Sequence, residues 1–252
     1  MPLQFFDSNC SIGMRNVFLK GSFYDIKSLL RRMEICRIRE AMVYYSLAEE
    51  YHPKKGNELL MEAIKGYNNL HPVWVVIPND TGEFYDPDIL LDLLKANNVK
   101  MVRAFPAKSA QNYGLFTQRS RALLAVLNEH KIPLMIGMDQ IDYDAVSSIA
   151  SEYKDIPLIL TNTGYRADRY LYPLLDSFRN IYIETSSYKV HFGIEALCAR
   201  FGTGRLIFGS GLPVYTAGSA VTMITHLLLP DEDKKKIAGD NLRHLLGGVI
   251  YD

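Results

Sequence analysis

Polar side chains that could do chemistry lie near the ends of short apolar runs in this sequence. Arg103 interrupts the run 100–105, and Glu184 follows the apolar residues 181–183. A guanidinium at such a place can hold a carboxylate or phosphate through two parallel hydrogen bonds. A carboxyl group whose pKa is raised by burial can act as a general base. Arg103 and Glu184 could instead form a buried ion pair, so both interpretations stay open.

Two further residues complete the predicted catalytic set, and a second set is predicted to bind substrate. Asn162 would polarise a substrate carbonyl, as Arg103 could, and His191, like Glu184, would move protons. The predicted substrate-binding residues lie at the ends of other runs or in the loops that follow them; they are Asn9, Ser11, Tyr44, Ser46, Tyr165, Lys189 and Ser210.

Several cations fall in the same loops and predict a mildly basic pocket mouth. They are Lys54, Lys55, Arg166, Arg169 and Lys189. Such a mouth favours an anionic metabolite as the ligand. Acidic residues of neighbouring loops could cancel this field; they are Glu49, Glu50, Asp80 and Glu83.

The elements that must position these residues follow from the alternation of apolar runs with amphipathic segments. The predicted strands cover 4–10, 41–46, 73–78, 100–105, 133–138, 157–162, 181–185 and 205–210. The predicted helices cover 25–36, 57–67, 87–96, 116–130, 143–153, 168–178, 190–201 and 217–229. Eight such βα units predict an α/β fold, a (β/α)₈ TIM barrel, with an extra C-terminal helix over 231–246. In such a barrel the C-terminal strand ends share one face, which carries the active site.

Composition sets the wider expectations. The chain has 252 residues, 48% of them hydrophobic, which fits one barrel domain over 1–252. Its 28 basic and 28 acidic residues balance, so we expect neither nucleic acid nor a membrane surface as a partner. The chain begins without a basic leader and contains no apolar run of roughly 18 residues, so we expect a cytoplasmic protein.

Four segments resemble the amidohydrolase superfamily, in its amidohydrolase-related (amidohydrolase-2) branch. They are 7–13, 102–106, 205–213 and 237–246. The last two are similar to the family patterns FGSD-x-P and GN-x-x-R-L-L and carry most of the resemblance. The resemblance implies a hydrolase and a homodimer. It also aligns the family's metal ligands with five positions of this chain, which are Asn9, Ser11, Gly137, Asn162 and Gly211.

These five residues offer no imidazole, thiolate or carboxylate, the groups that hold zinc in catalytic sites. The sequence therefore predicts no cofactor, with the family's metal, typically zinc, absent. The predicted function is hydrolysis, without a metal, of a lactone, amide or related bond in a small anionic metabolite. Two alternatives stay open: an inactive relative that binds a small molecule or a partner, and a conventional metal-dependent hydrolase whose ligands align differently. Whether the protein is an enzyme is thus left open.

Overall fold

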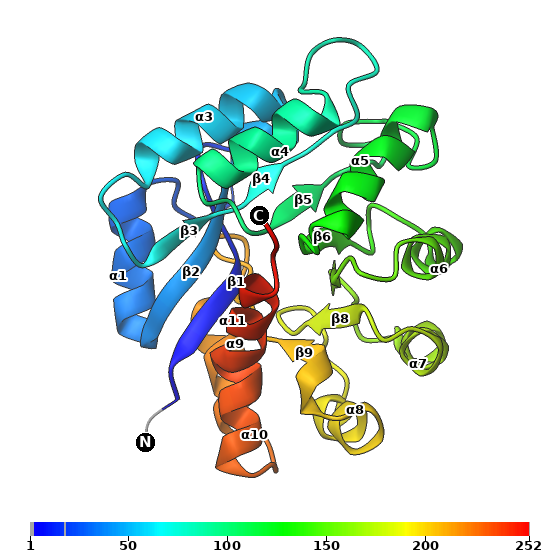
Figure 1. Ribbon diagram of the computed structural model, residues 1–252. Helices are drawn as coiled ribbons and strands as arrows, with labels where there is room; N and C mark the ends of the chain where they lie inside the picture. Colours follow the sequence, from blue (N-terminus) through cyan, green and yellow to red (C-terminus); the bar gives the residue numbers. More distant parts are fainter. Residues whose placement is uncertain (1–2, 18, 252) are drawn as a thin grey trace.

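A ring of parallel strands forms the centre of the computed structural model, which describes residues 3–17 and 19–251 (Figure 1). Apolar, β-branched runs of the sequence form most of these strands, because a strand covered on both faces is largely apolar. The strands are β1 (Phe5–Ile12), β2 (Ile38–Tyr45), β3 (Leu70–Pro72), β4 (Trp74–Val75), β5 (Val102–Ala104), β6 (Leu134–Gly137), β7 (Leu158–Thr161), β8 (Ile181–Glu184) and β9 (Leu206–Ile207).

Main-chain hydrogen bonds join these strands into a barrel. β3 and β4 are two halves of one barrel strand, because Val73 between them donates its N–H to the Val43 carbonyl at 2.8 Å. The ring closes where β1 meets the segment after β9. There the Ser11 N–H donates to the Leu212 carbonyl at 2.8 Å, and Cys10 pairs with Leu212. The eight-stranded TIM barrel predicted from the sequence is confirmed.

Helices surround the barrel and return the chain from one strand to the next (Figure 1). Asp25, Thr117 and Asp142 begin three of them, each side chain accepting a main-chain N–H of the first turn. The outer helices are α1 (Ile26–Cys36), α3 (Pro53–Ala63), α4 (Pro87–Ala96), α5 (Gln118–Glu129), α6 (Tyr143–Glu152), α7 (Asp168–Ser177), α8 (Gly193–Phe201) and α9 (Ala217–Thr225).

The structure differs from several predicted elements: α3 begins four residues earlier than the helix predicted over 57–67, and the strand predicted over 205–210 is regular only over Leu206–Ile207. Ser46, expected to end a strand, begins the short helix α2 (Ser46–Glu50), whose Ala48 packs directly against Gly56 of α3. The predicted strand 73–78 is regular only over Trp74–Val75. The last helix is divided into α10 (Asp231–Lys235), a π turn (Lys236–Asp240) and α11 (Asn241–Gly247). The π turn places the Ile237 carbonyl where it accepts the Phe208 N–H at 3.1 Å.

The hydrophobic core forms two layers, because successive side chains of a barrel strand point alternately inward and outward. The outer layer lies between strands and helices. The inner layer fills the barrel with residues such as Phe6, Met135 and Ile159, and α11 adds Leu242 and Leu245 to it. The barrel interior is therefore packed, and open space remains at the C-terminal ends of the strands.

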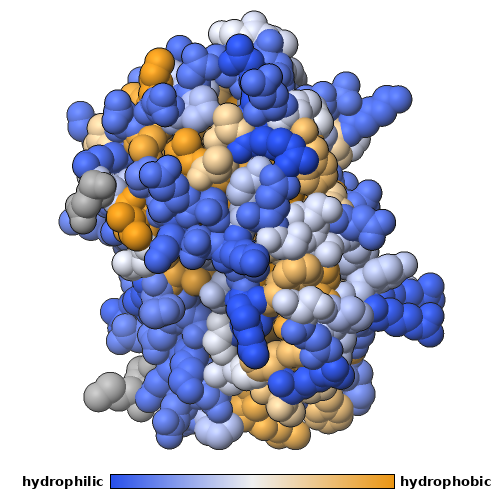
Figure 2. Space-filling model, turned by 45° about the vertical axis from the view of Figure 1, so that its right-hand side comes forward, coloured by the Kyte–Doolittle hydropathy of each residue, from blue (hydrophilic) through white to orange (hydrophobic). Residues whose placement is uncertain are grey.

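The surface of the protein is mixed in character. On the face shown in Figure 2, hydrophilic side chains are interspersed with apolar ones. Among the described residues, no helix has the length and apolar composition needed to cross a bilayer.

Candidate functional site

A cavity of about 190 Å³ opens at the C-terminal ends of the barrel strands. β1, β2 and β5, with α2 and the residues that directly follow β1 and β5, supply one part of its wall, and the end of β6 with the segments that follow β6, β7 and β9 supplies the rest. Its lining residues are Asn9, Ser11, Arg15, Tyr44, Glu49, Arg103, Phe105, Gly137, Asp139, Gln140, Asn162, Gly211, Leu212, Val214 and Tyr215. This is the face at which TIM-barrel enzymes carry out their chemistry.

Arg103 is the buried cation of the cavity, with 5% of its surface exposed. Its guanidinium carbon lies 4.6 Å from the centre of the Tyr44 ring and 4.9 Å from that of the Phe105 ring. One edge of the guanidinium is bound, because Nη1 donates to Asn9 Oδ1 at 2.6 Å. Among the described residues, no carboxylate oxygen lies within 4.0 Å of Arg103. Two aromatic faces and one amide oxygen thus stabilise the Arg103 charge, which has no counter-ion among the described residues.

Asn9 separates Arg103 from Glu184. While its Oδ1 accepts from Arg103, its Nδ2 donates to Glu184 Oε2 at 3.1 Å. The buried Arg103–Glu184 ion pair considered from the sequence is therefore not formed, because an amide bridges the two groups. Glu184 is fully buried behind Asn9 and does not line the cavity.

Burial raises the pKa of Glu184 to about 7, although three donors favour its charged form. Two of them come from Ser186, whose N–H and hydroxyl lie 2.6 and 2.8 Å from the carboxylate oxygens; the third is Asn9. Gly209 leaves the room for this side chain, since a Cβ there would lie 2.1 Å from Glu184 Oε1. Asp7, also fully buried, has a pKa raised by desolvation and contributes to the raised pKa of Glu184 through repulsion.

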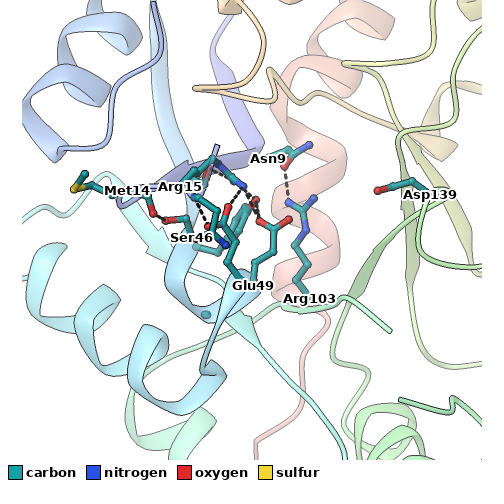
Figure 3. A network of polar contacts seen from close by, with 12 residues as sticks. Asn9, Met14, Arg15, Ser46, Glu49, Arg103 and Asp139 are labelled. Atoms are coloured by element: carbon teal, nitrogen blue, oxygen red, sulfur yellow. Dashed lines mark hydrogen bonds and ion pairs between the residues drawn. The ribbon is translucent and has the colours of Figure 1, made fainter. Parts of the chain in front are cut away.

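A second polar network lies on the side of β1 and β2 (Figure 3). Arg15 donates to Glu49 at 3.0 Å, to Ser11 Oγ at 3.0 Å and to the Tyr44 hydroxyl oxygen at 2.7 Å. It also reaches Glu50 at 3.3 Å, and the Tyr44 hydroxyl in turn donates to Glu49 at 2.8 Å. Two carboxylates pair with Arg15 in this network, so Arg103 is left as the cavity cation without a carboxylate partner among the described residues.

Asp139 lies across the cavity from Arg103, two residues after β6 (Figure 3). Its Oδ1 accepts from Asn162 Nδ2 at 2.7 Å, and its Oδ2 accepts from Gln140 Nε2 at 3.0 Å. Gly137 leaves space for it, because a Cβ there would lie 2.2 Å from Asp139 Oδ1. Asn162 follows β7 with a φ of 54°, a left-handed conformation that asparagine tolerates better than most residues. The cavity thus carries a cation at one side and a carboxylate at the other.

The structure brings together about half of the residues predicted from the sequence. Those that line the cavity are Asn9, Ser11, Tyr44, Arg103 and Asn162. Glu184 lies directly behind the wall. The five others lie outside the cavity lining; they are Ser46, Tyr165, Lys189, His191 and Ser210.

These five residues are either buried against the main chain or exposed on the surface. Ser46 and Ser210 are buried and hydrogen-bond the main chain, Ser46 to the Met14 carbonyl and Ser210 to the Leu212 N–H. Tyr165 and His191 are exposed and contact Arg166 and Phe192 respectively. Lys189 is exposed near the rim, with its ammonium 5.2 Å from the centre of the Tyr215 ring.

Sequence reasoning missed Arg15 and Asp139 as cavity residues and took Glu49 only as a loop charge. Asp139 was within reach of the strand-end argument, because it follows β6 by two residues. Arg15 lies in the longer segment after β1, and only its contacts with Glu49 show that it folds back over the cavity.

The amidohydrolase family matches residues 73–248, so this chain belongs to the amidohydrolase family. No curated protein matches the sequence. The fold, the face that holds the cavity and the family match agree on the class of protein, a TIM barrel of amidohydrolase type.

Solved structures with low sequence identity share this fold. A TIM-barrel protein from Bordetella bronchiseptica is 13% identical, with a TM-score of 0.77 over 98% of this chain and 99% of that one. 2,6-Dihydroxybenzoate decarboxylase from Rhizobium is 13% identical, with a TM-score of 0.75 over 98% and 99%. 5-Carboxyvanillate decarboxylase from Novosphingobium aromaticivorans is 12% identical, with a TM-score of 0.75 over 97% and 96%.

The prediction of no metal cofactor is wrong in the light of these neighbours, because the Novosphingobium decarboxylase was solved with bound manganese. The prediction rested on five aligned positions alone. It overlooked Asp139 and undervalued Glu49, two cavity carboxylates of the oxygen type that manganese prefers.

Among residues 3–17 and 19–251, no three His, Cys, Asp or Glu side chains come together as a metal-binding group. Asp139 fills the space beside Gly137, and a Cβ at Gly211 would lie 2.5 Å from the Tyr215 ring. The residues at the cavity therefore do not fit a manganese centre built on three such protein ligands.

Proposed function

We propose that this protein is an amidohydrolase-family enzyme that hydrolyses an amide, lactone or related bond in a small carboxylate substrate. Arg103 holds the substrate carboxylate at the base of the cavity. The observation that carries the proposal is the buried guanidinium, bound on one edge by Asn9 and without a carboxylate partner among the described residues.

The energetics of burial support this role. Removing a charge from water costs several kcal/mol unless a partner compensates it. The Tyr44 and Phe105 rings and the Asn9 amide compensate only in part, and Nε has no partner. A carboxylate that fills the cavity would complete the set with charge-assisted hydrogen bonds, which are the stronger kind.

The size of the cavity and the neighbours agree with a small acid. The cavity volume of about 190 Å³ lies below the roughly 300 Å³ at which typical ligand pockets begin. The Rhizobium and Novosphingobium neighbours are named for aromatic carboxylates, 2,6-dihydroxybenzoate and 5-carboxyvanillate. A carboxylate as the anchoring group of the substrate is therefore in keeping with enzymes of the same architecture.

Calorimetric titration with benzoate, pentanoate and the neutral benzamide tests the proposal. We expect the two acids to bind more tightly than benzamide, and Arg103→Gln to remove this preference. Arg166→Gln is the matched control, because Arg166 is exposed in the loop after β7 and does not line the cavity. Acids that bind no better than benzamide, or a preference that persists in Arg103→Gln, would refute the proposal.

Turnover is assayed on acids that keep a free carboxylate and carry an ester, amide or lactone group elsewhere in the molecule, with manganese chloride supplied. The proposal expects hydrolysis by the wild type that Arg103→Gln slows while Arg166→Gln leaves it unchanged. Binding without any turnover across the panel would instead favour an inactive relative that retains the ligand site.

A further inference from the structure

Asp139 is held in a fixed position by neutral groups. Asn162 and Gln140 donate one hydrogen bond to each of its carboxylate oxygens, at 2.7 and 3.0 Å. Gln140 is itself anchored, because its Oε1 accepts the Ala107 N–H at 3.3 Å. Gly137 supplies the space that the carboxylate occupies. These contacts orient Asp139 without neutralising it.

Asp139 has no cation partner in the described part of the chain. No Lys, Arg or His nitrogen there lies within 4.0 Å of its carboxylate. Arg15, the other cation of the cavity, is paired with Glu49 and Glu50. The two charges that line the cavity without a partner are thus Arg103, which is buried, and Asp139, which is exposed at the mouth.

The rest of the cavity wall is partly apolar. Phe105, Leu212, Val214 and the ring of Tyr215 belong to it. A ligand with a polar group at each end and a short apolar middle would match a lining of this composition. An acid without a second polar group would leave Asp139 with its two amide donors and no ligand contact.

We propose that the substrate is a small amino-carboxylate, whose carboxylate binds Arg103 and whose ammonium or amide N–H donates to Asp139. This inference rests on the proposed function, since it takes the carboxylate end as given. It adds a specificity determinant at the opposite side of the same cavity. Asp139 accepts a hydrogen bond from the substrate and thereby selects acids that carry a donor group over those that do not.

Matched pairs of probes test the inference by calorimetry at pH 7.5. One pair is 5-aminopentanoate and pentanoate, and the other is 4-(aminomethyl)benzoate and 4-methylbenzoate. We expect the amino member of at least one pair to bind up to about fivefold more tightly, the range measured for exposed ion pairs. Asp139→Asn should abolish this gain, measured in each protein as the ratio of the affinities for the two members of a pair, because asparagine carries no negative charge.

A control variant separates a specific contact with Asp139 from the general electrostatic field at the cavity mouth. Asp80→Asn removes an exposed carboxylate from the loop after β4 and should leave the gain unchanged. Plain acids that bind while the amino group adds nothing would overturn this inference and leave the proposed function standing. An equal loss of the gain in Asp80→Asn would overturn it as well. Failure of the plain acids to bind would instead refute the proposed function.

Discussion

Replacing Glu184 by glutamine should change how the stability of the protein depends on pH. Burial raises the pKa of this carboxyl group to about 7, against 4.5 for an unperturbed glutamate. The folded protein therefore favours the protonated form more than the unfolded chain does. The stability that this preference contributes is complete below pH 4.5 and is lost as the pH rises through 7.

The size of the effect follows from the shift in the pKa. Each pKa unit corresponds to 1.36 kcal/mol, so the change across this window is about 3 kcal/mol of unfolding free energy. Glutamine carries no charge at any pH and escapes this loss. It also has one oxygen instead of two to accept from Ser186 and Asn9, which costs about 1 to 3 kcal/mol at every pH.

Urea unfolding of the wild type and Glu184→Gln at several pH values between 4.5 and 8 measures the difference directly. We expect the variant to be the less stable protein at pH 4.5 and to gain about 3 kcal/mol on the wild type by pH 8. Comparing the two proteins cancels most of the contribution of Asp7, whose pKa is also raised by burial. Glu129→Gln, an exposed change at the end of α5, serves as the control. A difference between variant and wild type that does not change with pH would refute the reasoning.

Four further substitutions test the packing and the charge balance. Gly211→Ala should lower the free energy of unfolding by about 1 to 3 kcal/mol, since Gly211 has a φ of 68° and a Cβ there would meet the Tyr215 ring. Gly218→Ala in α9 should raise the free energy of unfolding, because a Cβ there meets no other atom. Thermal melts of both variants measure these changes. Arg205→Met should lower the melting temperature by the equivalent of about 2 to 5 kcal/mol, because two main-chain carbonyls lose their donor. Asn9→Asp should weaken benzoate binding at least about tenfold in calorimetry, since the new carboxylate would neutralise Arg103; unchanged affinity would contradict the assigned charge balance.

The barrel could be predicted from the sequence because its signal is repeated. Eight apolar runs alternate with helical segments, so an error in one unit leaves the count intact. The differences arise where tertiary contacts decide. The sequence pattern predicts that Ser46 ends a strand, yet α2 forms there because Ala48 fits against Gly56. The π turn in the last helix likewise depends on a main-chain contact between Ile237 and Phe208 that no local pattern indicates.

Only those cavity residues that lie near the C-terminal ends of strands could be predicted from the sequence. Asn9, Tyr44 and Arg103 reach the cavity because they point inward near the C-terminal ends of their strands. The sequence could not show that Asn9 bridges Arg103 and Glu184, since this depends on distances across three strands. Nor could it show how the segment after β1 folds, which brings Arg15 over the cavity.

The central claim is that the Arg103 guanidinium holds a substrate carboxylate. A crystal structure of the protein soaked with 4-bromobenzoate tests it most directly, because the anomalous signal of bromine locates the probe and its orientation. We predict that the carboxylate accepts hydrogen bonds from Arg103 and that the ring lies along Leu212 and Tyr215. A probe bound with its carboxylate away from Arg103, for example at Lys189 or Arg166, would contradict the account.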